Sequence, residues 1–259
     1  MKTDVKAKKH LGQHFLTDLT IAQNIVDGLS KTDSYKKVLE IGPGMGVLTQ
    51  FLIQNKNYQT YLIDIDTESI VYLKKHFVEI ENNIVEGDFL NMDLQTIAHQ
   101  EPFAVIGNFP YNISTQILFK ILDYKDQIPE MVGMFQKEVA ERVASQPGSK
   151  VYGITSVLIQ AFYDVEYLFT VNENVFNPPP KVKSGVIRLI RNKKSNLNCN
   201  ESMFKTVVKT AFNQRRKTLR NSLKSFIKEE YLDNPIFTLR PEALSVEQFI
   251  ELTSLLDNN

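Results

Sequence analysis

The chain has 259 residues, in which 30 lysines and arginines are balanced by 30 aspartates and glutamates. Its hydrophobic fraction of 42% excludes a disordered chain and is enough to fill a sizeable core. The single cysteine excludes an internal disulfide, and the four scattered histidines have no metal-ligand spacing, so we expect no protein-bound metal. Without an apolar signal segment or a run of about 18 apolar residues, we expect a soluble, cytoplasmic protein with no membrane partner.

The charged residues sum to zero, but the basic and acidic ones are unevenly distributed along the chain. Residues 1–14 carry a net charge of +3, and residues 181–228 carry +13 because fourteen basic residues face one glutamate. The remainder therefore carries −16. A basic segment of this density predicts a surface for a polyanion such as a nucleic acid, since binding releases counterions from phosphates. The alternative is a solvated, lysine-rich face without a partner.

Short apolar runs alternate with helical patterns through the first two thirds of the chain. We expect strands over residues 38–41, 61–64, 83–86 and 103–106, with helices over 46–55 and 67–77. Further strands are expected over 131–136, 164–171 and 185–191, with a helix over 154–161. This alternation predicts an α/β, Rossmann-like fold in which helices cover both faces of a mostly parallel sheet.

A glycine cluster, Gly42, Gly44 and Gly46, directly follows the first strand and opens a helix. Glycine allows a tight turn there and lets a ligand approach the main chain. Asp64 ends the second strand, where a carboxylate can accept both ribose hydroxyls of an adenosine ligand, and Asp88 follows the third. These features favour an adenosine cofactor over an ordinary loop, but they do not separate NAD from S-adenosylmethionine.

The motif Asn108-Phe109-Pro110-Tyr111 follows the fourth strand, at the carboxyl edge of the sheet where such folds bind ligands. It suits methylation of an exocyclic amine on a flat base. The Asn108 side-chain oxygen and the Pro110 carbonyl can each accept one N–H of the amine, and Tyr111 can stack on the base. Acceleration then comes mainly from alignment. The competing interpretation is a plain turn with a core tyrosine.

The C-terminal part of the chain changes character after a polar, turn-rich stretch. We place a domain boundary near residue 195, which gives domains over 1–195 and 196–259, the second all-helical and RNA-binding. Arg216, Arg220 and Lys224 are spaced at i, i+4 and i+8, which predicts one basic helix face.

These motifs together resemble the bacterial small-subunit (16S) rRNA adenine dimethyltransferase family, whose members have an S-adenosylmethionine-dependent methyltransferase domain. The resemblance covers nearly the whole chain. Matched blocks in order lie at 12–16, 40–49, 87–88, 108–115, 136–139, 149–153, 176–184 and 212–219.

The resemblance implies a cofactor site, a base site and an RNA-binding surface. For S-adenosylmethionine it implies the residues His14, Leu16, Gly42, Asp64, Asp88 and Asn108, in addition to the glycines Gly44 and Gly46 of the turn. Residues 108–111 would hold the target adenine, with Phe176 as a second stacking ring. The basic candidates for RNA binding are Lys181, Lys183, Arg215, Arg216, Lys217, Arg220 and Lys224.

Three positions depart from the commonest family pattern. His14 stands where asparagine is usual, Phe109 where leucine is usual, and Asp64 in place of a frequent glutamate. A histidine ring can still donate to a ribose or carboxylate oxygen. None of the three changes removes a required functional group.

The activity implied is the dimethylation of two adjacent adenines in the 3′-terminal hairpin of small-subunit rRNA, within a subunit assembly intermediate, by a monomeric enzyme. Three alternatives remain open. They are a large-subunit rRNA methyltransferase of the macrolide-resistance type, a non-catalytic RNA-binding assembly factor, and an NAD-dependent dehydrogenase. The missing third glycine of the dinucleotide fingerprint at position 47 disfavours the dehydrogenase.

Overall fold

The computed structural model describes residues 5–194 and 196–257. Contacts between Cα atoms divide the chain into two compact units. Unit 1 comprises Met1–Ala140 and Glu166–Arg191, and unit 2 comprises Glu141–Val165 and Asn192–Asn259. Residues 141–165 thus group with the C-terminal part of the chain. The boundary that the sequence predicts near residue 195 falls at a residue outside the described ones and stays a prediction.

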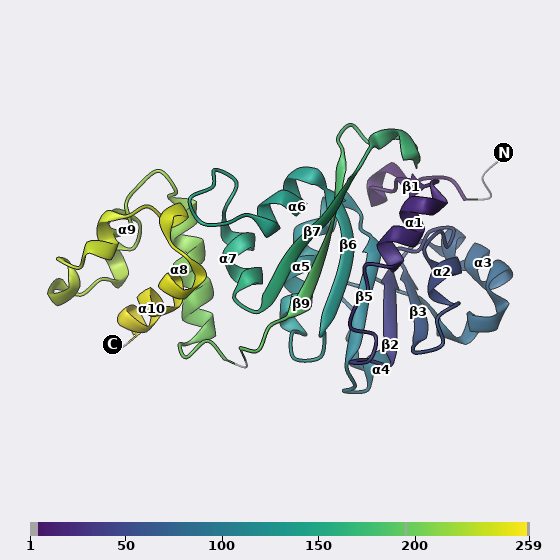
Figure 1. Ribbon diagram of the computed structural model, residues 1–259, viewed down its shortest axis with the longest axis horizontal. Helices are drawn as coiled ribbons and strands as arrows, with labels where there is room; N and C mark the ends of the chain where they lie inside the picture. Colours follow the sequence, from purple (N-terminus) through teal and green to yellow (C-terminus); the bar gives the residue numbers. More distant parts are fainter. Residues whose placement is uncertain (1–4, 195, 258–259) are drawn as a thin grey trace. The chain divides into compact units, whose positions relative to one another are not determined.

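Unit 1 is built on a seven-stranded sheet with the order β4-β3-β2-β5-β6-β9-β7 (Figure 1). Neighbours from β4 to β6 run parallel, and β9 is antiparallel to β6. The α/β, mostly parallel fold expected from the sequence is therefore confirmed. The strands are β2 (Lys37–Ile41), β3 (Gln59–Asp64), β4 (Ile84–Glu86), β5 (Phe103–Asn108), β6 (Glu130–Gln136), β7 (Tyr163–Val171) and β9 (Ser184–Arg191). A separate two-stranded sheet pairs β1 (Phe15–Leu16) with β8 (Phe176–Asn177).

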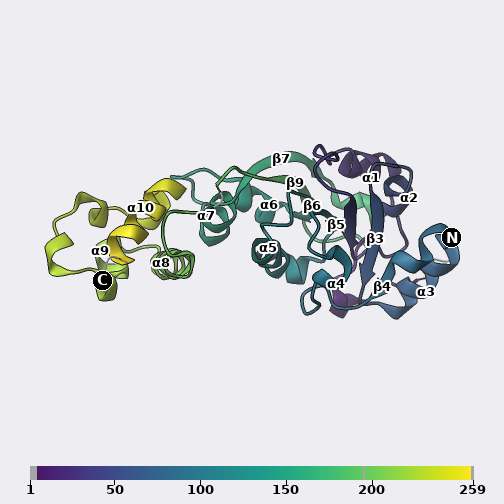
Figure 2. The same cartoon turned by 90° about the horizontal axis from the view of Figure 1, so that it is seen from below.

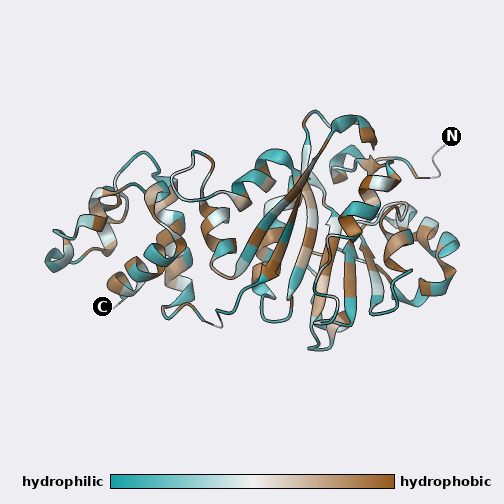
Figure 3. Cartoon of the chain, in the orientation of Figure 1, coloured by the Kyte–Doolittle hydropathy of each residue, from teal (hydrophilic) through white to brown (hydrophobic). Residues whose placement is uncertain are grey.

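Helices lie on both sides of the large sheet. The helices of unit 1 are α1 (Leu19–Val26), α2 (Thr49–Leu52), α3 (Thr67–His76), α4 (Gln95–Ala98) and α5 (Ser114–Asp123), and α6 (Lys137–Ala144) runs on into unit 2. Figure 2 shows α1 and α2 on one side of the strands and α4 and α5 on the other. The α1 side chains Ala22 and Ile25 share a buried cluster with Val38, Ala104 and Val132 of the strands, and Figure 3 shows hydrophobic colouring recurring along those strands.

Local sequence sets where these helices begin. The Asp18 carboxylate accepts hydrogen bonds from the main-chain N–H groups of Thr20 and Ile21 and so caps α1. Asp66 caps α3 in the same way through the N–H of Glu68. The helix expected over 46–55 is shorter than predicted, because α2 begins only at Thr49 after a glycine turn.

Unit 2 is helical, with α7 (Ile154–Gln160), α8 (Glu201–Asn213), α9 (Leu219–Ser222) and α10 (Val246–Asp257). Asn200 caps α8 by accepting from two main-chain N–H groups. Arg216, Arg220 and Lys224 do not share a helix, so that prediction is wrong. A turn ends α8, α9 has only four residues, and Lys224 begins a separate 3-10 helix, because Thr218 takes up an extended backbone that interrupts the helical run.

Candidate active site

The glycine turn after β2 forms one wall of a cavity at the carboxyl edge of the sheet. Gly42 and Gly44 have φ angles of 66° and 56°, in the left-handed region that favours glycine. A Cβ at Gly42 would meet nothing closer than 3.9 Å, so the glycine leaves free space above the turn. A Cβ at Gly44 would lie 2.7 Å from the Phe15 ring. The turn thus offers its main chain to a ligand.

Asp64, the last residue of β3, stands beside this turn with its side chain facing the cavity. The carboxylate is 6% exposed and accepts hydrogen bonds from the N–H groups of Asp66 at 2.9 Å and Gly44 at 3.2 Å. Burial raises the pKa of Asp64, and these N–H groups oppose the rise. Each carboxylate oxygen has a second lone pair available, which fits vicinal ribose hydroxyls.

A further part of the cavity lining combines apolar side chains with a second carboxylate. Ile65, Phe89 and Leu90 line the cavity, and Ile65 is 54% exposed, so an apolar side chain is presented to a flat ring. Asp88 accepts from the N–H of Leu90 at 2.9 Å, which fixes its carboxylate at the cavity edge. An adenosine group fits this combination of carboxylates, apolar walls and open glycine turn.

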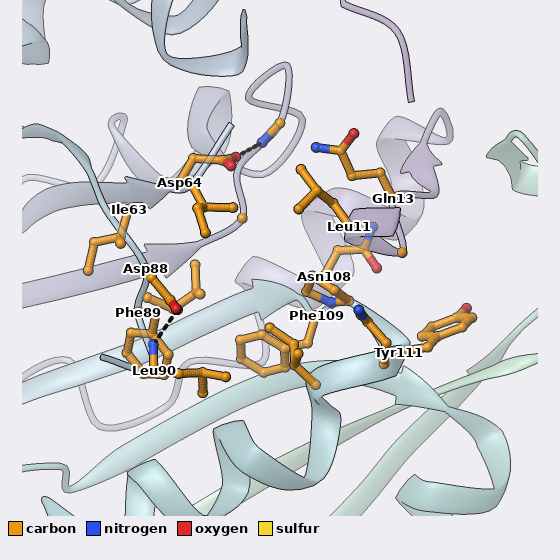
Figure 4. Close-up of a pocket in the computed structure, with 18 of the residues that line it drawn as sticks. Leu11, Gln13, Ile63, Asp64, Asp88, Phe89, Leu90, Asn108, Phe109 and Tyr111 are labelled. Atoms are coloured by element: carbon orange, nitrogen blue, oxygen red, sulfur yellow. Dashed lines mark hydrogen bonds between the residues drawn. The ribbon is translucent and has the colours of Figure 1, made fainter. Parts of the chain in front are cut away.

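Asn108 ends β5 and also lines the cavity. Figure 4 shows it between Asp64 and Tyr111, with Leu11 and Gln13 nearby. Its side-chain nitrogen donates a hydrogen bond of 2.9 Å to the main-chain carbonyl of His14. Because a carbonyl can only accept, this contact identifies the nitrogen end of the amide and leaves the Asn108 oxygen free as an acceptor.

Pro110 retains acceptor capacity at its carbonyl. The oxygen accepts from the N–H of Ile113 and from the Ser114 hydroxyl, both at 3.3 Å. The single Ser114 hydroxyl proton has a closer acceptor in the Tyr111 carbonyl, at 3.1 Å. When the proton is donated there, one lone pair of the Pro110 oxygen remains free. Asn108 and Pro110 can therefore each accept an N–H of an amine.

Tyr111 is anchored at both its ring and its hydroxyl. The hydroxyl lies 2.6 Å from the Ser184 hydroxyl, and the ring stacks on His14 with centroids 5.5 Å apart and planes at 30°. The His14 Nδ1 donates to the carbonyl of Pro178 at 2.8 Å, since that oxygen can only accept. The histidine thereby holds the tyrosine ring in place beside the cavity.

Phe109 lines the cavity but is 1% exposed and packs into the sheet. Its ring contacts Phe135, with centroids 5.0 Å apart. Gly107 and Gly133, paired across β5 and β6, make room for the ring, since a Cβ at Gly133 would lie 2.2 Å from it. Phe109 therefore supports the Asn108–Tyr111 motif by packing into the sheet. Its ring does not offer a free face for stacking on a base in this structure.

The other predicted cofactor residues have different surroundings. Leu16 is buried and lines an adjoining cavity that shares Gly42 and Asn108 with the first. Gly46 lies outside both sets of lining residues, and a Cβ there would lie 2.3 Å from the Phe77 ring. Gly46 therefore serves close packing.

Phe176 does not provide an accessible stacking ring in this structure. It is 4% exposed, pairs with Leu16 between β8 and β1, and belongs to a buried hydrophobic cluster of unit 1. The sequence identifies Phe176 as an aromatic residue in a matched block, but its burial in the core depends on strand pairing that the local sequence does not encode.

Asp66, which no sequence motif marks as functional, is 2% exposed although it carries a carboxylate. The Lys8 ammonium donates to it at 2.5 Å and the Gln13 amide at 3.1 Å. Burial alone would raise the pKa of Asp66, but these hydrogen bonds, led by that from Lys8, hold it below its ordinary value. The available signal was an acidic residue at a helix N-cap, two positions beyond Asp64. Lys8 thus pairs within the protein, and Lys2, counted in the same basic segment, lies outside the described residues.

The basic candidates separate into exposed and engaged side chains. Lys181, Lys183, Arg216, Lys217 and Lys224 are exposed. Two others are engaged with the protein. The Arg215 guanidinium donates to the Ser149 carbonyl at 3.2 Å and lies 3.8 Å from the Glu242 carboxylate, and Arg220 donates to the Leu232 carbonyl.

Two classes of site are not found in the described part of the chain. Over residues 5–194 and 196–257, no group of three or more His, Cys, Asp or Glu side chains could hold a metal ion. Over the same residues, no helix has both the length and the apolar character needed to cross a membrane.

The fold and cavity together define a class of protein. A mostly parallel sheet with an antiparallel β9, a glycine turn after β2 and acidic residues ending the next strands are typical of S-adenosylmethionine-dependent methyltransferases. Comparisons agree. A dimethyladenosine transferase from Plasmodium falciparum superposes with a TM-score of 0.78 at 28% identity, covering 92% of this chain and 96% of the other. The 23S rRNA methyltransferase ErmE, at 24% identity and a TM-score of 0.71, shows the same fold over 94% of this chain and 100% of its own.

Sequence comparisons then specify the family. The model of the ribosomal RNA adenine dimethylase family matches residues 4–257. A ribosomal RNA small subunit methyltransferase A from Cytophaga hutchinsonii is 64% identical over 97% of this chain and 98% of its own, and that of Phocaeicola vulgatus is 58% identical over 98% and 90%. The chain belongs to the ribosomal RNA adenine dimethylase family and is an S-adenosylmethionine-dependent rRNA adenine dimethyltransferase. The dehydrogenase alternative is thereby excluded.

Proposed function

We propose that this enzyme transfers methyl groups to the N6 amines of two adjacent adenosines in the 3′-terminal hairpin loop of small-subunit (16S) rRNA. It acts as a cytoplasmic monomer on an assembly intermediate of the small ribosomal subunit. The names of the relatives, at 56–64% identity, support the small subunit as the source of the substrate. A hairpin loop suits the reaction because its bases can leave the stack at little cost.

The observation that carries the chemistry is the orientation of the Asn108 amide. Its nitrogen is committed to the His14 carbonyl, which leaves its oxygen as the free acceptor of a residue that lines the cavity. With the Pro110 oxygen as a second acceptor, the two N–H bonds of an adenine N6 amine are held in fixed directions. This constraint turns the nitrogen lone pair out of conjugation with the ring, which makes a weak nucleophile reactive along one line.

The cavity residues would hold the cofactor in parts. We assign Asp64 to the ribose hydroxyls, Asp88 and the apolar wall to the adenine, and the turn at Gly42 with the adjoining cavity near Leu16 to the amino-acid end. S-adenosylmethionine supplies the methyl group as a cationic sulfonium, and transfer to the neutral amine moves the positive charge to nitrogen, from which a proton leaves to water.

The same acceptors allow a second transfer to each base. A monomethylated amine keeps one N–H, which either Asn108 or Pro110 can accept, so the nitrogen remains aligned after the first methylation. Tyr111, held by Ser184 and His14, offers one ring face for stacking on the base. Burial raises the pKa of Tyr111, so its hydroxyl stays a neutral hydrogen-bonding group.

We propose that the exposed basic residues Lys181, Lys183, Arg216, Lys217 and Lys224 contact rRNA phosphates. Arg215 and Arg220 instead stabilise the fold of unit 2, because their guanidinium groups already donate to main-chain carbonyls.

The test is incubation of unmethylated small subunits, and separately large subunits, with the enzyme and methyl-labelled cofactor, followed by mapping of the labelled nucleotides. Label on two adjacent adenosines of the 3′-terminal hairpin is the expected result. Label in large-subunit rRNA would replace this proposal with the macrolide-resistance type of activity. Tight RNA binding without label would indicate a non-catalytic assembly factor.

A further inference from the structure

Asp66 is buried, yet the proposed chemistry gives it no task. It caps α3, and its backbone N–H donates to the Asp64 carboxylate. Its own carboxylate accepts four hydrogen bonds, from Lys8 Nζ (2.5 Å), Gln13 Nε2 (3.1 Å), Glu68 N (3.1 Å) and Ser69 Oγ (3.1 Å). A helix cap needs one or two of these contacts, so the two bonds from the N-terminal segment require a separate explanation.

Those two bonds close a loop of the N-terminal segment. While the Gln13 side-chain nitrogen donates to Asp66, its side-chain oxygen accepts from the backbone N–H of Lys8 at 2.8 Å. Lys8 also pairs with Glu68 at 3.2 Å. The residues Leu11 and Gly12 lie between these anchors and line the cavity. We call residues 8–14 the arm.

The end of the arm reaches the methyl-acceptor side of the cavity. The His14 carbonyl accepts from the Asn108 amide, and the His14 ring bonds Pro178 and stacks on Tyr111. An unbroken series of contacts therefore connects Asp66, through Gln13 and His14, to Asn108. Asp66 also touches Asp64, so one residue contacts both the carboxylate on the cofactor side and the arm.

We propose that Asp66 is a positioning residue for methyl transfer, acting through Lys8 and Gln13 to hold the arm, whose His14 carbonyl fixes the rotamer of Asn108. The proposal rests on the role given above to Asn108. Without the Asp66 contacts, the arm keeps the Lys8–Glu68 ion pair and the contacts of the His14 ring, but Gln13 loses its anchor to the body of unit 1. The His14 carbonyl, which directly follows Gln13 in the chain, is then held less firmly. Asn108 can then rotate, and its oxygen no longer meets the amine along the productive line.

The test uses variants on the arm, because Asp66 also caps α3 and donates its backbone N–H to Asp64, so changes at Asp66 act on more than the arm. Gln13→Leu removes both side-chain hydrogen bonds of Gln13. Lys8→Met removes the ammonium group but keeps a long, unbranched side chain. Lys6→Met is the matched control, since Lys6 is an exposed lysine just outside the arm. Lys8→Arg serves as rescue of the ion pair. Asp66→Asn is measured last.

Three measurements distinguish positioning from a purely structural role. They are kcat and KM for rRNA methylation, the dissociation rate of S-adenosylhomocysteine from the enzyme without RNA, and hydrogen exchange of the main-chain amides of residues 11–13. We expect Gln13→Leu and Lys8→Met to lower kcat about tenfold with an unchanged KM for RNA, to speed dissociation, and to raise exchange about tenfold. Lys6→Met and Lys8→Arg should remain within twofold of the parent.

Wild-type kcat, dissociation and exchange in both Gln13→Leu and Lys8→Met would overturn the proposal. A loss seen only in Asp66→Asn would overturn it as well, because the loss would then come from contacts of Asp66 other than those with the arm. Faster exchange with an unchanged kcat would show that the arm does not position Asn108.

Asn108→Ala, measured in parallel, separates failure of the role proposed for Asp66 from failure of the role proposed for Asn108. If Asn108→Ala keeps full turnover, the role of Asn108 is wrong. If it loses turnover while the arm variants do not, only the role of Asp66 is wrong.

Discussion

The amide nitrogen of Asn108 and the main-chain carbonyl of His14 lie 2.9 Å apart, although 94 residues separate them in the chain. This bond decides which end of the amide is left free as an acceptor at the cavity. An asparagine side chain is symmetric enough to fit either way, and only a partner that accepts without donating excludes the reversed arrangement. The backbone of one segment thereby determines the chemistry that a side chain of another can perform.

Replacement of Asn108 should therefore separate binding from catalysis. We expect Asn108→Ala to retain binding of S-adenosylhomocysteine and rRNA but to lower kcat by roughly 100- to 1,000-fold, the usual effect of removing one positioned hydrogen-bonding group. Asn108→Asp should be equally inactive, because a carboxylate would place an oxygen against the His14 carbonyl. Single-turnover methylation and equilibrium binding measure the two effects, and turnover above a tenth of the parent in either variant contradicts the expectation.

Glu40 predicts an unusual dependence of stability on pH. Burial raises the pKa of this fully enclosed carboxyl group to about 8, the charge of Asp64 adds to the rise, and the hydrogen bond from Thr49 opposes it. The folded state thus binds the proton more tightly than the unfolded state. Its contribution to stability is complete below the ordinary pKa of 4.5 and is lost as pH rises through about 8.

The matched variant is Glu40→Gln, which is neutral at every pH. We expect the free energy of unfolding of the parent to fall relative to that of Glu40→Gln by up to about 1.4 kcal/mol per pH unit inside this window. Denaturant unfolding at pH 5, 6.5 and 8 measures the difference. Parallel curves for the two proteins would mean that Glu40 is ionised in the folded protein.

The glycine at position 133 should be intolerant of even one methyl group as long as Phe109 is present. A Cβ there would lie 2.2 Å from the Phe109 ring, so we expect Gly133→Ala to destabilise the protein by about 1–3 kcal/mol and to lower kcat by displacing the backbone of Asn108. Thermal unfolding and methylation rates measure both effects.

A second substitution tests the cause. Phe109→Leu shortens the side chain that collides, so the double variant Gly133→Ala with Phe109→Leu should recover most of the stability lost by Gly133→Ala alone. Additive losses in the double variant would show that the collision is not responsible.

Adjacent arginines in unit 2 should behave differently despite their identical chemistry. Arg216 is exposed, so Arg216→Ala should weaken RNA binding and reduce the slope of log affinity against log salt by about 1. Arg215 bonds Ser149 and faces Glu242, so Arg215→Ala should leave the slope unchanged and lower the free energy of unfolding by about 1 kcal/mol. Filter binding at several salt concentrations, with thermal unfolding, checks both. Equal salt slopes in the two variants would contradict the assignment.

The sequence was informative wherever function depends on local order. The glycine turn directly follows β2, and Asp64 is the last residue of β3. The positions of Gly42 and Asp64 can therefore be predicted from the alternation of strands and helices and from the turn chemistry of glycine. The same alternation predicts Asn108 just after a strand over 103–106, and in the structure β5 extends to Asn108 itself.

The remaining features depend on contacts between distant segments. Asp66 meets Lys8 across 58 residues, and no local pattern shows that pairing. Phe176 has the residue type of a stacking ring, yet its strand pairs with β1 and its ring enters the core. The regular spacing of Arg216, Arg220 and Lys224 suggested a helix that Thr218 interrupts, because spacing alone does not register an extended residue.

The pairing of β1 with β8 has a consequence for the order in which the protein matures. The arm that completes the cavity continues into residues 15–17, which are held by residues 175–178. A growing polypeptide shorter than about 178 residues cannot make these contacts, even when β2 to β6 and the glycine turn are already present. The contacts that complete this side of the cavity can therefore form only after about 178 of the 259 residues have been synthesised.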